Sequence, residues 1–186
     1  MEPITCRAMA VDDLHIHMMD EFDRRQEITH ILRKNGRVKK LRKPRVEDWN
    51  AEDKKRFIQG FFIQKVYLRQ YYSGEPLVFA AFRGGQVAAF AVWDHYWGEE
   101  KEYAALLRLF VSCECRRMGL GRQLFTLCVE AAKNEGAQKL FISTENSVET
   151  QEFYKSMGCT AAKKRLYGPK TDVPMEFALQ FPPVTS

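Results

Sequence analysis

The 186-residue sequence lacks several features that would place it in common classes. No apolar run approaches the ~20 residues that a membrane-spanning helix needs. The start, Met1-Glu2-Pro3-Ile4, lacks the basic and then apolar layout of a signal peptide. Internal repeats, low-complexity segments and domain linkers are also absent. We therefore expect one cytoplasmic domain over 1–186, with no membrane contact and a loose tail at 182–186.

Cysteine and histidine are scarce. The chain has 5 Cys and 4 His residues. The cysteines are Cys6, Cys113, Cys115, Cys128 and Cys159. Their odd count and their spacing match no disulfide framework and no zinc cluster. His15 and His17, two residues apart, would not share a helix face. We expect reduced thiols and no metal site.

Two familiar phosphate-binding motifs are missing from the one glycine-bearing loop that follows an apolar strand. The strand is predicted at Leu106–Val111, within a run that begins at Tyr103, and the loop is Arg116–Arg122. No Gly-Lys-Ser/Thr sequence ends this loop, so it is not a Walker A loop. Leu124 stands where a dinucleotide fingerprint would have its third glycine.

The loop nevertheless has the properties of a diphosphate cradle. Apolar residues recur at helical spacing from Leu120, and Gly136 ends that helix. A helix N-terminus presents unpaired N–H groups and partial positive charge. Gly119 and Gly121 would let a phosphate approach the backbone closely. Three basic side chains add positive charge: Arg116, Arg117 and Arg122.

The pattern Arg116-x-x-Gly119-x-Gly121, after a strand and before a helix, resembles the acetyl-CoA-binding signature of the GNAT superfamily of N-acetyltransferases. The segments that follow have the family's order and spacing, from about residue 77 to 181: Lys139–Thr144, Asn146, Phe153-Tyr154-Lys155 and Gly158. The resemblance implies an α/β (α+β) fold with a mixed, mainly antiparallel central sheet flanked by helices. It also implies acetyl-CoA as the acyl-donor co-substrate. We expect direct attack by an amine within a ternary complex, because no cysteine stands in a recognisable nucleophile arrangement.

The resemblance assigns roles to individual residues. The implied cofactor-binding residues are Phe110, Val111, Arg116, Arg117, Met118, Gly119, Leu120, Gly121, Arg122 and Asn146. Backbone amides near Phe110 and Val111 would polarise the thioester carbonyl. Tyr154 would protonate the leaving thiolate, the alternative being a helix residue that packs beside the cofactor. Asn146 would contact the pantetheine arm, or cap the next helix.

The acceptor side of the site is less defined. The candidates for a general base lie in one polar loop: Asp94, His95, Glu99, Glu100 and Glu102. The expected pocket walls are Trp93, Tyr96, Trp97 and a helix over 50–72. We expect a primary amine on a small molecule or peptide as acceptor. The sequence leaves its identity open, and also the oligomeric state, for which a homodimer is one alternative.

The segment Arg33–Arg45 is unusually basic, since eight of its thirteen residues are Lys or Arg. Asn35-Gly36 predicts a hairpin inserted between the first two strands, with both turn residues at positive φ. The alternative is a helix through Leu32 that ends there. The charge could form a solvated face, attract an anionic cofactor or substrate, or bind nucleic acid, which is the less common case. The alternative function is a non-catalytic protein that binds CoA or nucleic acid.

The remaining elements follow from periodicity and turn residues. We predict a strand over 4–8, a helix from Asp12 to Phe22, strands over 77–82 and 87–93, a helix from Asn146 to Met157, and a final hairpin of 160–167 with 173–181. The strand at Leu106–Val111 should be antiparallel to the strand before it. It should be parallel to the strand after it, through a crossover helix.

Overall fold

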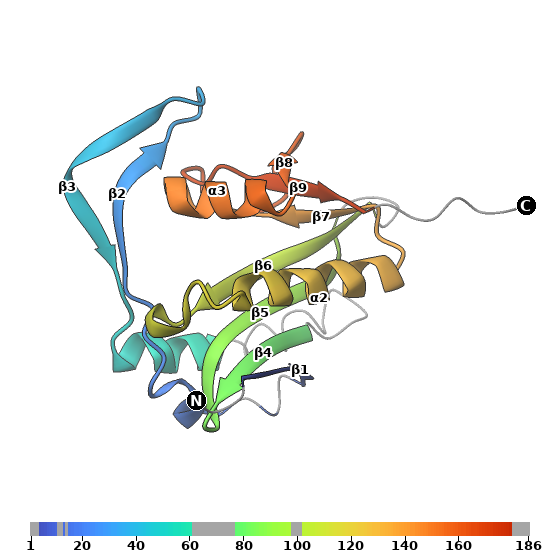
Figure 1. Cartoon of the computed structure of the whole chain (residues 1–186). Coiled ribbons are helices and arrows are strands. Elements are labelled where there is room, and N and C mark those ends of the chain that lie inside the picture. The colour runs from blue at the N-terminus through green and yellow to red at the C-terminus, as the bar shows by residue number, and fades with distance from the viewer. Residues whose placement is uncertain (1–3, 11–12, 14, 61–76, 98–101, 180–186) are drawn as a thin grey trace, which may run out of the picture.

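The computed structural model describes residues 4–10, 13, 15–60, 77–97 and 102–179, and its centre is one seven-stranded sheet. The strand order is β1-β4-β5-β6-β7-β9-β8 (Figure 1). The strands are β1 (Thr5–Met9), β4 (Leu77–Arg83), β5 (Gln86–Trp97), β6 (Tyr103–Val111), β7 (Lys139–Ile142), β8 (Thr160–Ala161) and β9 (Met175–Ala178). Every neighbouring pair is antiparallel except β6 and β7. The predicted mixed, mainly antiparallel sheet is confirmed.

The parallel pair β6 and β7 is connected by α2 (Leu120–Asn134), the predicted crossover helix. One stripe of α2 is buried: Leu120, Leu124, Phe125, Cys128, Val129 and Ala132. Gly136 follows the helix with φ +80°, a conformation that glycine adopts without strain. The strand, loop and helix unit therefore forms where the local sequence predicts it.

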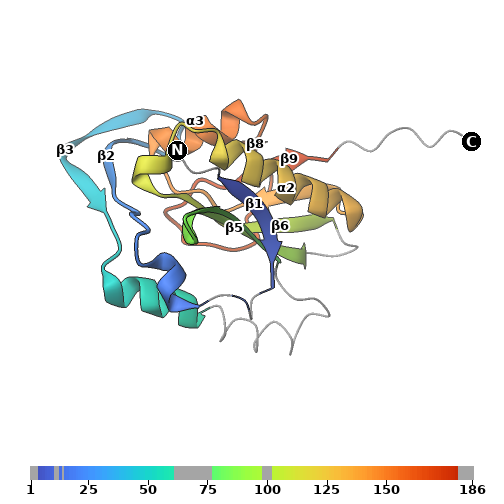
Figure 2. The same cartoon turned by 60° about the horizontal axis from the view of Figure 1, so that its bottom comes forward.

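Helices cover both faces of the sheet. Figure 2 shows α2 and α3 (Val148–Ser156) on one face and a helix over 51–60 on the other. Side chains of β5 alternate between the two cores: Ala91 and Trp93 face α2, whereas Phe90 and Val92 face the helix over 51–60. That helix begins as predicted, because the Asn50 side chain accepts from the Asp53 amide at 2.9 Å. Its predicted continuation to residue 72 lies outside the described residues.

A second, two-stranded sheet projects from one side of the molecule (Figure 1). It consists of β2 (Gln26–Leu32) and β3 (Val38–Glu47), which pair antiparallel, and we call it the basic ribbon. The helical alternative for this segment is wrong. The turn also differs from the prediction, since Gly36 has φ +77° whereas Asn35 does not have a positive φ. The Gly36 amide donates to the Arg33 carbonyl at 2.8 Å, which makes a three-residue turn with glycine at its left-handed position.

Several boundaries differ from the predictions. The helix predicted from Asp12 to Phe22 is replaced by a short 3-10 helix, η2 (Ile16–Met19), although Met18 and Phe22 are buried as expected. Strand β5 extends to Trp97, because Asp94 pairs with Ala105 and Trp97 with Tyr103. Strand β7 ends at Ile142, two residues early. The final hairpin is short, because only Thr160 and Ala161 of its first strand pair with β9.

None of the helices in the described part of the chain combines the length and the apolar content that crossing a bilayer requires. The five cysteines are free thiols, and Cys113 is exposed.

Candidate active site

The sheet opens where β6 and β7 diverge. The two strands pair from Tyr103 with Lys139 to Leu106 with Ile142, and there β7 ends. Strand β6 continues to Val111 and is held on its other edge by β5, which pairs Ala89 with Val111. The backbone edge of residues 107–111 that faces away from β5 therefore has no partner strand in the described structure. Phe110 and Val111, the predicted amide donors, lie in this stretch.

Tyr167 lies at the point of divergence. Its hydroxyl donates to the Leu106 carbonyl at 2.8 Å, at the last paired position of β6. Burial raises the pKa of the Tyr167 phenol, so the hydroxyl keeps its proton and this hydrogen bond persists at neutral pH. Tyr167 thus satisfies a carbonyl at the end of the β6–β7 pairing.

The glycine loop connects the end of β6 to α2 through a 3-10 turn, η4 (Cys113–Cys115). Arg117 has φ +64° and Gly119, the N-cap of α2, has φ +82°. No side chain caps this helix, so its first amides remain available for an anion. A β-carbon at Gly119 would meet nothing within 4 Å, which leaves open space beside the backbone. The exposed side chains of Arg117 and Arg122 flank this terminus.

Arg116 has a different place from its two neighbours. Its Nε donates to the Val111 carbonyl at 3.2 Å and a terminal NH2 donates to the Arg24 carbonyl at 3.1 Å. It therefore fixes the end of β6 to the segment that enters the basic ribbon. The charge of Arg116 remains near the loop, but its guanidinium is already used in these two contacts.

Gly121 has a packing role beyond the one predicted. A β-carbon at Gly121 would lie 3.3 Å from Cε2 of Phe153, a closer approach than most carbon contacts allow. The missing side chain therefore lets α2 and α3 approach each other beside the cradle. This is a second reason for glycine at this position.

Tyr154 is almost fully buried on α3, at 6% exposure. Its ring packs edge-on against Phe125, with centroids 6.1 Å apart, and against Phe153 at 5.0 Å. Burial, with smaller contributions from Cys159, Tyr167 and Cys128, raises the pKa of the phenol. The hydroxyl thus stays protonated across the physiological range.

A network of two arginines and two glutamates lies between the basic ribbon and the end of β7. Arg24 donates to Glu47 at 2.9 Å, and Arg45 pairs with Glu47 at 3.2 Å and with Glu145. Interaction between the carboxyl groups of Glu47 and Glu145 lowers the pKa of Glu47 and raises that of Glu145. The Arg24 guanidinium lies 4.7 Å from the ring centroid of Phe110, which places this network beside the diverging part of β6.

The two carboxyl groups of the network titrate differently. Burial, then the hydrogen bond with Glu47 and its charge, raise the pKa of Glu145 to about 7, against the opposing effects of Arg45 and Arg24. Burial also acts to raise the pKa of Glu47, but hydrogen bonds with Glu145 and Arg24 and the charges of Arg24 and Arg45 lower it overall. Glu145 can therefore exchange a proton near neutral pH.

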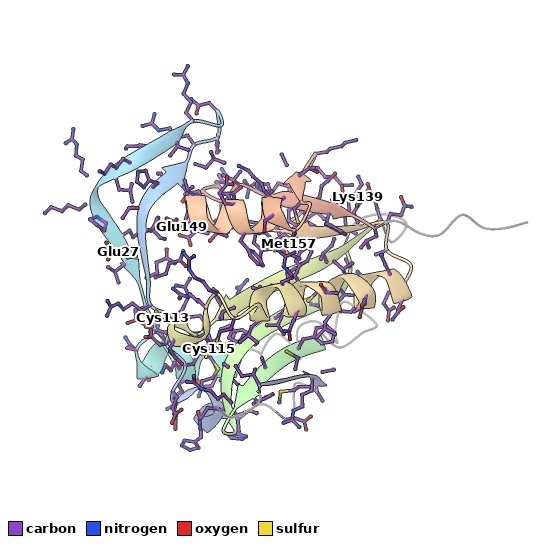
Figure 3. All side chains as sticks on the ribbon, in the orientation of Figure 1. Glu27, Cys113, Cys115, Lys139, Glu149 and Met157 are labelled. Carbon is purple, nitrogen blue, oxygen red and sulfur yellow. The ribbon has the colours of Figure 1, made fainter. Side chains whose placement is uncertain are left out.

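Two of the predicted base candidates, Asp94 and Glu102, lie away from this network. Asp94 is not in a solvated loop, because β5 extends through it and it is buried at 1% exposure. Glu102 precedes β6, at the end remote from Val111, and pairs with Lys164 at 2.9 Å. Hydrogen bonds and charges from Lys164 and Lys139 lower the pKa of Glu102, in spite of desolvation. Lys139 marks this end in Figure 3, opposite Cys113. Glu99 and Glu100 lie outside the described residues, and the side chain of His95 is not described.

The predicted walls are only partly present. Trp93 is wrong as a wall, because it is fully buried in the core beneath α2. The side chains of Tyr96 and Trp97 are not described. On the opposite face of the sheet, Trp49 packs against Phe57, with ring centroids 4.7 Å apart, and against Phe110 at 5.2 Å. Phe57 comes from the predicted helix over 50–72.

One further correction concerns the region after β7. The N-cap of α3 is Ser147, whose hydroxyl accepts from the Thr150 amide at 3.3 Å, and not Asn146. The Asn146 carbonyl instead accepts from the Leu32 amide at 2.7 Å. Asn146 thus joins the basic ribbon to the site. Within the described residues no group of three or more His, Cys, Asp or Glu side chains could hold a metal ion.

Sequence reasoning missed Arg24, Glu47 and Glu145. Glu145 lies shortly after the end of β7 at Ile142, and ligands of open sheets commonly bind beyond the carboxyl ends of strands. Its position after a strand is therefore the feature of the sequence that could have identified Glu145 as a site residue. No local sequence pattern identifies Glu47 as a site residue, since it simply follows a run of basic residues.

Comparisons with known proteins agree with this fold. The sequence model of the acetyltransferase (GNAT) family matches residues 26–159, and the chain belongs to this family. No curated protein sequence matches the chain. Among solved structures, nourseothricin acetyltransferase is 18% identical, with a TM-score of 0.67 over 95% of this chain and 99% of that one. A putative streptothricin acetyltransferase from Bacillus anthracis, solved with acetyl coenzyme A, is 16% identical, with a TM-score of 0.65 over 97% and 99%. The ribosomal-protein-S18-alanine N-acetyltransferase from Escherichia coli is 19% identical, with a TM-score of 0.58 over 99% of both chains.

Proposed function

We propose that this protein transfers an acetyl group from acetyl-CoA to a primary amine of a small molecule or peptide. Membership of the acetyltransferase family supports the reaction class. Similar structures include one solved with acetyl coenzyme A and one whose title names an alanine N-acetyltransferase. The observation that carries the proposal is the divergence of β6 and β7 beside the uncapped N-terminus of α2.

The residues present fit the co-substrate. The first amides of α2, with Arg117 and Arg122, would hold the diphosphate, and the open space at Gly119 admits it. The edge of β6 at Phe110 and Val111 that faces away from β5 would hold the acyl and pantetheine end, and Asn146, which follows β7, would lie near it. When bound, acetyl-CoA supplies an activated thioester. Backbone N–H groups aimed at its carbonyl stabilise developing negative charge.

Two side chains of the chain handle protons in this proposal. The carboxylate of Glu145 accepts a proton from the incoming amine, because most primary amines are protonated at neutral pH and cannot attack in that form. The hydroxyl of Tyr154 holds the proton that the leaving sulfur needs. A buried phenol is a weak acid, so Tyr154 must lie within hydrogen-bond distance of the sulfur to act.

Calorimetry and a thiol-release assay test the proposal together. Acetyl-CoA should bind the purified protein, and its thiol should be released only when an amine from a panel is added. Failure of both acetyl-CoA and CoA to bind would refute the proposal. Binding without amine-dependent thiol release, across amino acids, polyamines, antibiotics and peptides, would instead favour a non-catalytic CoA-binding protein.

A further inference from the structure

Positive charge is concentrated in one part of this chain. Residues 33–45 carry eight of the 29 Lys and Arg residues and none of the 24 Asp and Glu residues. The rest of the chain, with 21 basic and 24 acidic residues, is net acidic although the whole chain is at +5. The basic ribbon is thus opposite in charge to the body that carries it.

Most basic side chains of the ribbon are exposed and form no ion pair in the described structure, so they are available to bind a ligand. All eight basic residues of 33–45 are exposed, and in the described structure only Arg45 pairs with a carboxylate. Val38 and Val46 on the same strand are also exposed, at 58% and 59%. Figure 3 shows side chains projecting outward from this end of the molecule. A ten-residue strand such as β3 is about 33 Å long and directs successive side chains to opposite faces.

The ribbon is nevertheless held in a fixed place. At its foot, the Cys113 amide donates to the Asp23 carbonyl at 2.8 Å, near the end of β6. Nearer its tip, Leu32 bonds Asn146, and Ile31 pairs with Ser147 at the start of α3. A groove of about 400 Å³ beside these contacts is lined by three basic residues, Arg33, Lys34 and Lys170, among others. The ribbon therefore spans the two halves of the diverging sheet.

We propose that the basic ribbon binds nucleic acid through its phosphates and holds it beside the candidate active site. A groove of a duplex has phosphates along both walls and admits a two-stranded ribbon, so basic side chains on both faces of β3 can be used. An extended acidic peptide fits less well. It would add to the free edge of β3, where Pro44 lacks an N–H and charged side chains oppose strand pairing.

Fluorescence anisotropy with a labelled 20-base-pair DNA duplex, at 50 to 200 mM KCl, tests the proposal on the full chain. If five of the eight basic residues contact phosphates, affinity should fall about 500-fold over this range, since each contact adds about 0.9 to the salt slope. The triple variant K39Q/K40Q/R42Q should lose only about 10-fold over the same range and bind more weakly at 50 mM. An RNA stem–loop of similar length tells whether DNA or RNA is preferred.

The matched control is K55Q/K155Q/K163Q, which removes three exposed charges outside the ribbon. It should bind the duplex like the parent protein. Two results would overturn the proposal: no binding of either nucleic acid at 50 mM KCl, or equal weakening by the two triple variants. Tighter binding to polyglutamate than to both nucleic acids would also overturn it and indicate an acidic protein partner. Because the readout is binding, the proposal stands or falls separately from acetyl transfer, and the affinity for acetyl-CoA should be the same in all three proteins.

Discussion

Replacement of Glu145 by glutamine tests the proton acceptor directly. With a pKa of about 7, Glu145 is a carboxylate in about a tenth of the molecules at pH 6 and in about nine tenths at pH 8. If it accepts the proton of the amine, kcat/KM of the parent protein relative to Glu145→Gln should rise about tenfold between these pH values. At pH 8 the variant should be slower by about 100-fold or more, the usual range for general-base catalysis.

The ratio of the two proteins is the informative quantity. The comparison uses an acceptor amine with a pKa below about 5, which is neutral at both pH values, so that Glu145 removes the proton of the attacking nitrogen and ionisation of the free amine does not enter the ratio. The assay is thiol release at saturating acetyl-CoA with the best such amine of the panel. Glu149→Gln, a nearby exposed acid on the first turn of α3, is the matched control and should give a ratio that does not change with pH. A flat ratio for Glu145→Gln would refute the assignment.

Substitutions of two neighbours of Glu145 provide a second test, because they should shift its pKa in opposite directions. The charge of Arg45 lowers the pKa of Glu145, whereas Glu47 raises it through a hydrogen bond and its charge. Arg45→Gln should therefore move the midpoint of the pH profile to higher pH, and Glu47→Gln should move it to lower pH. Shifts in the same direction would show that another group controls the profile.

Three further predictions concern the helices and thiols. Tyr154→Phe should lower kcat by about 100-fold and leave acetyl-CoA affinity nearly unchanged; an unchanged kcat would remove the hydroxyl from the mechanism. The effect of Gly121→Ala on the free energy of unfolding should be more favourable by about 1 kcal/mol in a Phe153→Leu background than in the parent protein, because the added β-carbon would lie 3.3 Å from the Phe153 ring. A double-mutant cycle measured by denaturant unfolding that shows no coupling between the two positions would contradict this. Exposed Cys113 should react with an aromatic disulfide reagent in the folded protein, whereas Cys128, whose pKa is raised by burial, should react only after unfolding; equal rates would be inconsistent with the core.

The sequence predicted the elements whose signals are local. The cradle is one continuous segment, with an apolar strand, two glycines and a helical stripe that ends at Gly136. The turn between β4 and β5 is similar, since Gly84 and Gly85 both have positive φ and stand together in the chain. In these places local propensity and tertiary structure agree, so a pattern of few residues suffices.

The wrong predictions fall where contacts between residues far apart in the sequence determine the local structure. Asp94 was assigned to a polar loop, but pairing with Ala105 extends β5 through it. Asn146 and Ser147 are both good caps, and sequence alone does not separate them by one position. The Arg24–Glu145 network joins residues from the start of the ribbon and the end of β7, so no local pattern could reveal it. Its partners meet only because the ribbon spans both halves of the sheet.

The placement of charge also bears on the acceptor. In the proposed reaction the amine would enter beside Glu47 and Glu145, whose charges are offset by Arg24 and Arg45. The basic residues of the ribbon would repel cations over about 10 Å at 0.1 M salt. A polycationic acceptor would therefore be disfavoured, whereas the anionic part of an acceptor with a single amine could lie along β3. Under the proposed reaction, we expect amines that carry acidic or phosphate groups to be better acceptors than polyamines.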